Sequence, residues 1–237
     1  MSGATVPVDP SEPVIDLDQH PSPLDLYAEG LKGSTVYLRD GHGGRELLPV
    51  RRWVAGLQPG DEGLLARCLG PTLDIGCGPG RLVSALRDRG GSVLGIDVSA
   101  AALDLARAVG APVLERDVFS VVPRTGQWAR LLLADGNIGI GGDPVRLLRR
   151  CRTLLSRDGL VLAELADAPA DDGAVSGARS FRLESSSGQV SAWFPWAVVD
   201  LGEVRRAALA AGLAVVGTWA EAGRSFVALG RTAAAGS

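Results

Sequence analysis

The feature that most constrains the fold of this chain is a glycine-rich segment between an apolar strand pattern and a helical one. Residues 74–80 read DIGCGPG, with Gly76, Gly78 and Gly80 at alternate positions. Glycine permits the backbone angles of a sharp turn and lets a ligand come close to the main chain. The unpaired N–H groups at the start of the following helix point toward such a ligand. The segment therefore predicts a ligand-binding turn at the carboxyl end of a strand.

Strand and helix patterns alternate on both sides of this turn. The predicted strands cover residues 72–75, 92–96, 112–115, 129–134 and 160–165. The predicted helices cover residues 81–89, 100–109 and 144–156. Strands that alternate with helices favour a parallel sheet with both faces covered. We therefore expect an α/β fold with a doubly wound, mostly parallel sheet.

The segments around this core predict three further parts. Residues 1–23 are rich in Pro, Asp and Ser and are expected to form a flexible N-terminal arm. Residues 24–69 are expected to hold a β-hairpin around Asp40–Gly44 and a short helix, and residues 70–232 the main domain. A C-terminal β-hairpin insertion is expected near 178–194, with strands over residues 180–184 and 189–194. We expect the arm and both hairpins to overhang the strand ends and cover a pocket.

Acidic residues follow the predicted strands in an informative order. Asp97 ends the second strand, where doubly wound folds place an acid that binds ribose hydroxyls, and Asp117 follows the third. The dinucleotide fingerprint G-x-G-x-x-G does not fit, because Arg81 occupies its third glycine position. Asp74 would repel a pyrophosphate and suits an ammonium or sulfonium group better. A nicotinamide-dependent oxidoreductase is therefore the less favoured alternative.

The segment 74–80 resembles the first motif, D-x-G-x-G-x-G, of the class I S-adenosylmethionine-dependent methyltransferases, and the resemblance extends over roughly residues 70–166. It implies a Rossmann-like fold with a reversed final strand and S-adenosyl-L-methionine as cofactor. In this family the glycines hold the methionine part, Asp74 helps to position its amino group, Asp97 binds the ribose and Asp117 contacts the adenine. The cofactor-binding residues implied in this way are Asp74, Gly76, Cys77, Gly78, Gly80, Asp97, Val98, Asp117, Val118 and Asp135.

Three residues are candidates for the chemistry of the acceptor. Asp135 follows the fourth strand and either orients the acceptor or accepts its proton, or belongs to a structural turn. Asn137 could orient the acceptor through hydrogen bonds. His20, in the arm, is either a general base or an exposed side chain, whereas His42 lies in a glycine-rich turn and is expected to be solvated. Cys77 is expected to fill space, because methyl transfer from a sulfonium needs no covalent intermediate.

Several side chains have two open interpretations. The aromatic residues Trp193, Phe194 and Trp196 form either a wall of the acceptor pocket or part of the core. Tyr27 and Tyr37 either line that pocket or pack beneath the arm. Arg224 either meets an anionic acceptor or, as we expect, lies on the surface.

Composition narrows the function further. The formal net charge is -3, and without a basic excess a nucleic-acid partner is not expected. No apolar run is long enough to span a membrane, and the three cysteines suit a reducing, cytoplasmic location without a disulfide framework or a metal site. Together with the family resemblance, these features lead us to expect O- or N-methylation of a small molecule, such as a specialised metabolite. The alternatives are a methyltransferase acting on protein or RNA and a non-catalytic cofactor-binding protein, and the oligomeric state stays open.

Overall fold

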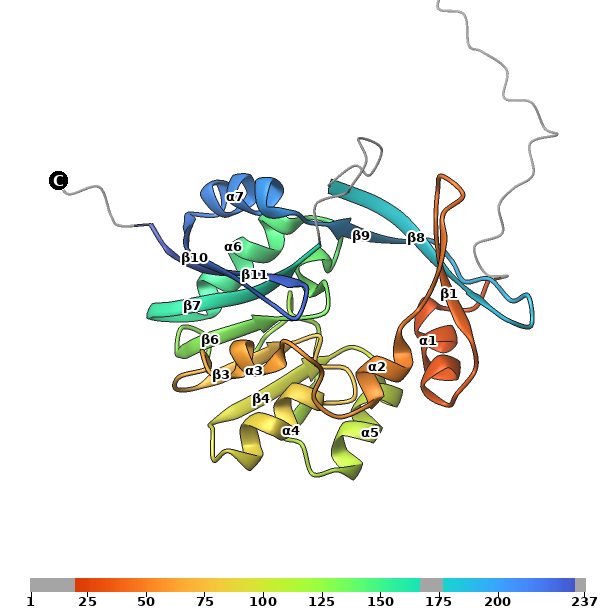
Figure 1. Ribbon diagram of the computed structural model, residues 1–237, viewed down its shortest axis with the longest axis horizontal. Helices are drawn as coiled ribbons and strands as arrows, with labels where there is room; N and C mark the ends of the chain where they lie inside the picture. Colours follow the sequence, from red (N-terminus) through yellow and green to blue (C-terminus); the bar gives the residue numbers. More distant parts are fainter. Residues whose placement is uncertain (1–19, 167–176, 233–237) are drawn as a thin grey trace, which may run out of the picture.

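The computed structural model describes residues 20–166 and 177–232, which form two β-sheets with helices packed around them (Figure 1). The part of the predicted arm before residue 20, residues 167–176 and the last five residues lie outside the described residues. None of the helices in the described ranges is both long and apolar enough to cross a bilayer.

Seven strands of the described chain form the central sheet. In order across this sheet they are β10 (Leu213–Glu221), β11 (Arg224–Arg231), β7 (Leu155–Leu165), β6 (Trp128–Leu133), β3 (Thr72–Ile75), β4 (Val93–Asp97) and β5 (Val113–Glu115). The strands from β7 to β5 are parallel to one another, whereas β11 runs antiparallel to β7 and β10 antiparallel to β11. The predicted mostly parallel sheet and the reversed final strand are both confirmed.

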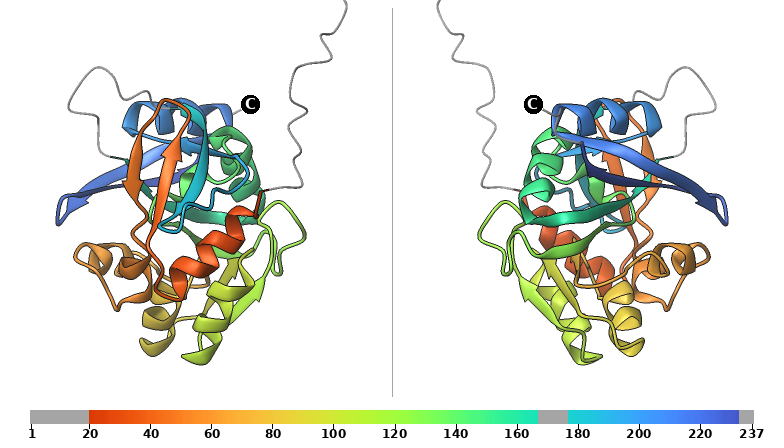
Figure 2. Two further views of the ribbon diagram at one scale, coloured as in Figure 1. Left: turned by 90° about the vertical axis from the view of Figure 1, so that its right-hand side faces the viewer. Right: turned by 90° about the vertical axis from the view of Figure 1, so that its left-hand side faces the viewer.

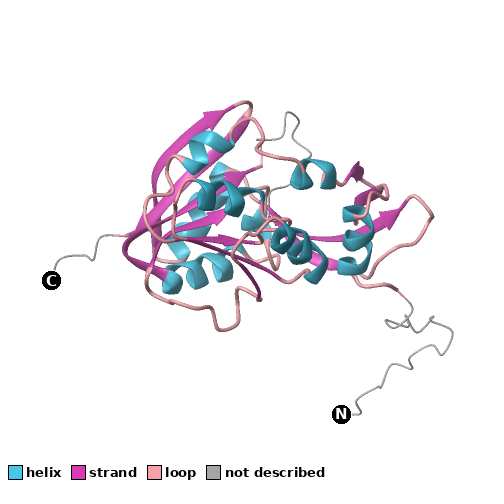
Figure 3. Cartoon of the chain, turned by 90° about the horizontal axis from the view of Figure 1, so that it is seen from below, coloured by secondary structure: helices cyan, strands magenta, loops and turns pink. Residues whose placement is uncertain are grey.

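Helices cover both faces of this sheet (Figure 3). They are α3 (Asp61–Leu65), α4 (Arg81–Asp88), α5 (Ala100–Ala108), α6 (Pro144–Leu154) and α7 (Leu201–Ala210), with a short 3₁₀ helix, η2 (Asn137–Gly139), after β6. Successive side chains of β6 point to opposite faces of the sheet, and each face packs against different helices. Leu131 and Leu133 pack in the cluster that contains residues of α6 and α7, whereas Leu132 packs with residues of α3 and α4.

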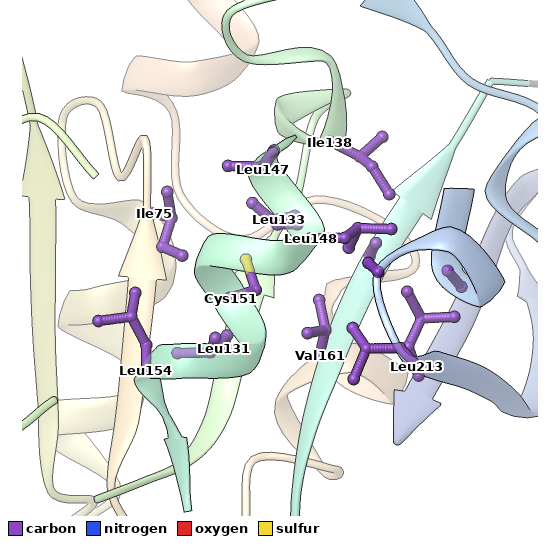
Figure 4. Close-up of a cluster of buried hydrophobic side chains, with 14 of the residues drawn as sticks. Ile75, Leu131, Leu133, Ile138, Leu147, Leu148, Cys151, Leu154, Val161 and Leu213 are labelled. Carbon is purple, nitrogen blue, oxygen red and sulfur yellow. The ribbon is translucent and has the colours of Figure 1, made fainter. Parts of the chain in front are cut away.

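Helix α6 illustrates how the sequence determines one of these contacts. Asp143 caps it, because its Oδ1 accepts the N–H of Arg146 at 2.9 Å, and Pro144 occupies the first turn, where its missing N–H costs nothing. The helix buries Leu147, Leu148, Cys151 and Leu154 on one face, toward Leu131 and Leu133 (Figure 4). It ends at Leu154 and not at the predicted Ser156, because Leu155 already pairs with Trp128 at the start of β7.

A second sheet lies beyond one end of the central sheet (Figure 1). Its order is β2 (Arg45–Leu47), β1 (Val36–Asp40), β8 (Gly177–Ser185) and β9 (Phe194–Val198), and all its pairs are antiparallel. The predicted N-terminal hairpin is β1–β2. Its turn is held by Asp40, whose Oδ1 accepts the N–H groups of His42 and Gly44 at 3.0 and 2.6 Å.

The predicted insertion near 178–194 is present, but its second strand was placed too early. Residues 189–193 were expected in this strand, whereas β9 begins only at Phe194, opposite Phe181. Within the expected range, Val190 forms only an isolated bridge with Glu184. At the next position the N–H of Leu183 donates to the Oγ of Ser191 at 2.9 Å and not to a backbone oxygen, so the regular ladder is interrupted until Phe194.

Pairing between β1 and β8 joins the two hairpins into one sheet, with Val36–Asp40 opposite Phe181–Ser185. Figure 2 shows β1, β2 and β8 side by side, with α1 (Pro23–Leu31) packed against them. A short helix, α2 (Val50–Val54), then leads back toward the central sheet. The sequence did not predict α1, α2 or the joint sheet, and the domain boundaries given above remain a prediction.

Candidate functional site

A cavity of about 650 Å³ lies between the carboxyl ends of the central strands and the second sheet. This volume falls within the range of roughly 300–1,000 Å³ that is typical of small-molecule pockets. We call the wall formed by the ends of β3, β4, β5 and β6 and the loops that follow them the loop side. We call the wall formed by α1, α2, η2 and the second sheet, with the segments next to them, the apolar side.

The glycine loop (residues 74–80) forms the floor of the loop side. Gly76, Gly78 and Gly80 all have positive φ, at 72°, 52° and 84°. A Cβ on Gly76 would lie 2.7 Å from the Nδ2 of Asn137, which donates to the backbone oxygens of Ile75 and Gly76 at 3.0 and 2.8 Å. Asn137 therefore holds the loop in shape, whereas its predicted role toward the acceptor stays a prediction.

Gly80 acts differently from the other two glycines. It is not part of the cavity wall, and a Cβ there would lie 2.9 Å from the Cβ of Ala106 in α5. Its small size permits close packing between the start of α4 and α5. Cys77 lines the cavity and is buried in a small cluster with residues of α4 and α5, as expected of a space-filling side chain. Burial raises the pKa of its thiol.

Asp97 lies at the end of β4 and faces the glycine loop. Its Oδ2 accepts the N–H of Gly78 and its Oδ1 the N–H of Ser99, each at 2.8 Å. Burial raises the pKa of this carboxyl, although both hydrogen bonds oppose the shift. Val98, next in the chain, is 49% exposed and lines the cavity. Asp97 thus fixes the loop at the position where the family resemblance implies a ribose contact.

Asp117 and Val118 follow β5 on the same wall. Asp117 is exposed, and its Oδ1 accepts the N–H of Phe119 at 2.9 Å, whereas Val118 is buried. The structure therefore brings together all the predicted cofactor residues at one sheet edge, with Gly80 just behind the wall. Their individual contacts with a cofactor remain predictions.

Asp74 is buried at the end of β3, directly beneath the loop. Burial, together with the charges of Asp135 and Asp97, raises its pKa to about 8. Carboxyl groups that oppose each other's ionisation in this way would gain from a nearby cation. S-adenosylmethionine carries a sulfonium and an ammonium group, so the acidic wall and the glycine cradle both fit this cofactor.

Asp135 belongs to a buried charge network that the sequence did not predict. Its core consists of Asp61, Arg81, Asp135, Glu164 and Arg224, and the partly exposed Arg52 of α2 lies 3.8 and 3.9 Å from the carboxylates of Asp135 and Glu164. Asp135 has a φ of 52°; its N–H donates to Glu164 Oε2 at 2.7 Å, and its carboxylate accepts from Arg81 Nη2 at 2.5 Å. Because Arg81 already binds this carboxylate, the geometry favours a structural role for Asp135 over that of a free base.

Arg224 is the centre of this network. It donates to both oxygens of Glu164, at 2.8 and 2.7 Å, and to Asp61 Oδ1 at 2.8 Å. Arg81 closes the network by its ion pair with Asp61. The expectation of a surface position for Arg224 is wrong, because the residue is only 9% exposed. No local sequence pattern indicates this network, since its core members come from five separate elements or loops.

The apolar side is lined by aromatic and aliphatic residues of both hairpins. Phe181 and Phe194 lie with their ring centroids 6.5 Å apart, and Trp196 lies on the same strand as Phe194. Trp193 does not line the cavity; it is 48% exposed, and the guanidinium of Arg182 lies 4.8 Å from its ring centroid. The predicted aromatic cluster is therefore divided between the cavity wall and the outer surface.

Tyr27 of α1 connects the two sides. A Cβ on Gly78 would lie 3.4 Å from its hydroxyl oxygen, and its ring packs edge-on against Trp53 of α2 at 5.9 Å. Burial, with the nearby carboxylates, raises the pKa of Tyr27 above its usual range, so the hydroxyl is a neutral donor. Its helix had a signal in the sequence, because Ser22 and Asp25 form a capping box around Pro23.

The histidines lie elsewhere. His20 precedes α1, is exposed and is not among the residues that line the cavity, and the same holds for His42 in the β1–β2 turn. The described residues contain no group of histidine, cysteine and acidic side chains arranged to hold a metal ion.

Comparison with known proteins gives a consistent result. Residues 72–159 match a family model described as a methyltransferase domain. A search of curated proteins gives no match. Among solved structures, a methyltransferase from Bacteroides fragilis in complex with S-adenosyl-L-homocysteine is similar at a TM-score of 0.76 and 20% identity, over 90% of this chain and 97% of that one.

Two further structures agree in fold. The glycopeptide N-methyltransferase MtfA complexed with S-adenosyl-L-methionine has a TM-score of 0.55 and 15% identity, over 73% of this chain and 92% of that one. CalS10 from Micromonospora echinaspora, an amino pentose methyltransferase involved in calicheamicin biosynthesis, has a TM-score of 0.53 and 18% identity, over 73% and 88%.

Proposed function

We propose that this protein, a class I S-adenosylmethionine-dependent methyltransferase, methylates a small-molecule acceptor at oxygen or nitrogen. The observation that carries the proposal is the apolar side of the cavity. It continues directly from the glycine loop and belongs to the same cavity of about 650 Å³. Such a pocket surrounds a compact ligand and does not follow a polymer chain.

The bound cofactor supplies an electrophilic methyl carbon on its sulfonium. The residues of this chain bind the donor and the acceptor and align them for methyl transfer. The glycine loop and Asp97 fix the donor at the strand ends, and the carboxyl of Asp74 beneath the loop favours a cation there. The apolar side excludes water and orients the acceptor. We therefore attribute most of the rate to proximity and alignment.

The charges of the cavity wall support a small molecule over RNA. The described lining residues carry the carboxylates of Glu46, Asp97, Asp117 and Asp135, against the guanidinium groups of Arg81 and Arg116. Asp74 also lines the cavity, but its raised pKa keeps it mostly protonated at neutral pH when no cation is bound. A wall with this balance repels phosphates. Two proteins of similar fold, a glycopeptide N-methyltransferase and an amino pentose methyltransferase, also support an acceptor that is not a nucleic acid.

The test is transfer of a labelled methyl group from S-adenosylmethionine to separate pools of small molecules, proteins and RNA. We expect label in the small-molecule pool, and label only in protein or RNA would contradict the proposal. Calorimetry with S-adenosylhomocysteine and NAD accompanies the assay. Binding of S-adenosylhomocysteine without transfer to any pool would favour a non-catalytic protein, and binding of NAD alone an oxidoreductase.

A further inference from the structure

We propose that the acceptor is an apolar molecule that carries a protonated amine, and that Glu46 binds this amine at the mouth of the apolar side. The proposal rests on the function proposed above and specifies its substrate class. Three features of the structure support it: the direction of the Glu46 side chain, the absence of a partner for it among the described residues, and the charge of the surrounding wall.

The pairing of β1 with β2 turns Glu46 toward the cavity. Glu46 lies opposite Leu38 in this pair, and both residues line the cavity. Side chains of directly opposed residues share one face of a sheet. The preceding residue, Arg45, points to the other face, where its guanidinium lies 3.4 Å from the ring centroid of Tyr37 and pairs with Glu184 at 3.3 Å. Glu46 and Leu47 both line the cavity, and because the whole of β2 is exposed, the Glu46 carboxylate lies at the mouth of the cavity.

The Glu46 carboxylate has no partner within the described part of the chain. No hydrogen bond or ion pair joins it to any described residue. By contrast, Glu184 on the outer face pairs with both Arg39 and Arg45. A carboxylate without a cation, beside apolar walls, favours a ligand that brings its own positive charge.

The rest of the apolar side supports a cation with an apolar body. Among the described residues that α1, α2, η2 and the second sheet contribute to the wall, Glu46 carries the single charge. Phe181, Phe194 and Trp196 offer flat apolar surfaces to the remainder of the ligand. On the loop side Arg81 is already bound by Asp61 and Asp135, so it is not available to an anionic acceptor. The other cavity arginine, Arg116, precedes Asp117 after β5, at the end of the cavity that we assign to the cofactor.

The experiment compares two probes with the same carbon skeleton, 2-phenylethylamine and 2-phenylethanol. Each is titrated into the protein saturated with S-adenosylhomocysteine, and tryptophan fluorescence is followed, because Trp53 and Trp196 line the cavity. The proposal predicts tighter binding of the amine. It also predicts that Glu46→Gln weakens binding of the amine about fivefold, as expected for a pair at a solvent-accessible site, and leaves binding of the alcohol unchanged.

The matched control is Glu184→Gln, which removes the same charge from the outer face of the same sheet and should leave both probes unaffected. Equal binding of amine and alcohol, or an equal loss for both probes in Glu46→Gln, would overturn the inference. Affinity for S-adenosylhomocysteine separates the two proposals. If it is normal while the amine preference is absent, this inference fails alone; if S-adenosylhomocysteine does not bind at all, the proposed function fails as well.

Discussion

The two sides of the cavity are built in different ways. The loop side consists of short segments that each follow a parallel strand, and polar contacts fix it: Asp97 to Gly78, Asn137 to the backbone of the loop, and Asp135 to Arg81. The apolar side is assembled by pairing β1 with β8, from parts of the chain far apart in sequence, and is fixed mainly by packing.

This difference in construction suggests that the two sides bind different ligands. A wall of converging polar groups suits one ligand of defined chemistry, because each group must find its partner. A wall of apolar residues accepts different shapes at a modest cost in affinity. We therefore expect changes on the loop side to affect the cofactor and those on the apolar side to affect the acceptor, and the following predictions test this separation.

The largest effect is expected for Arg224→Met. Removing the guanidinium leaves the buried Glu164 without its two-point partner and leaves Asp61 paired with Arg81 alone, which should lower the free energy of unfolding by about 3–5 kcal/mol. Urea unfolding measures this. Arg206→Met, at an exposed position on α7, is the control and should change little. A loss as small as that of the control would mean that the network does not stabilise the loop side.

Asp97→Ala should weaken binding of S-adenosylhomocysteine about 100-fold, because the ligand loses a charged acceptor and the loop loses its bond at Gly78. Calorimetry measures the affinity, with the exposed Asp104→Ala as control. Unchanged affinity would remove Asp97 from the cofactor site.

Asp74 should make the stability of the cofactor-free protein depend on pH. Its pKa in the folded state is raised to about 8, whereas the unfolded value is about 3.9, so between these values the folded state binds more protons. Stability should therefore fall as pH rises through this window, by up to about 1.4 kcal/mol per pH unit. Urea unfolding at several pH values gives the free energy of unfolding as a function of pH. This free energy should fall less steeply with pH in Asp74→Asn than in the wild type, and an equal fall in both proteins would contradict the raised pKa.

Phe194→Ala tests the apolar side alone. It removes one aromatic surface of the wall, so binding of 2-phenylethylamine should fall about fivefold. Affinity for S-adenosylhomocysteine, measured in parallel, should stay the same. A comparable loss for both ligands would show that the two sides are not separate.

The smallest effect is expected for His20→Ala. The side chain is exposed and lies outside the cavity wall, so methyl transfer should proceed at the wild-type rate. If His20 were the general base, turnover would fall by about 100-fold or more. A steady-state rate assay at neutral pH distinguishes these outcomes.

Local patterns were sufficient where neighbours in sequence are neighbours in space. The glycine loop, the cap at Asp143 and the alternation of parallel strands with helices all follow from short-range rules, and the structure agrees with them. Short-range rules could not predict contacts between segments that are far apart in the sequence. The buried position of Arg224 and the true second strand of the insertion at Phe194 depend on partners that local patterns do not identify.

The sequence by itself determined the central sheet and the donor end of the cavity, because residues 74–80 and Asp97 lie at strand ends that hydrophobic periodicity already locates. Only the tertiary structure decided the acceptor end. Pairing of Val36–Asp40 with Phe181–Ser185 turns Leu38 and Glu46 toward the same cavity as Phe194, and the register of a sheet is chosen by the whole packed core.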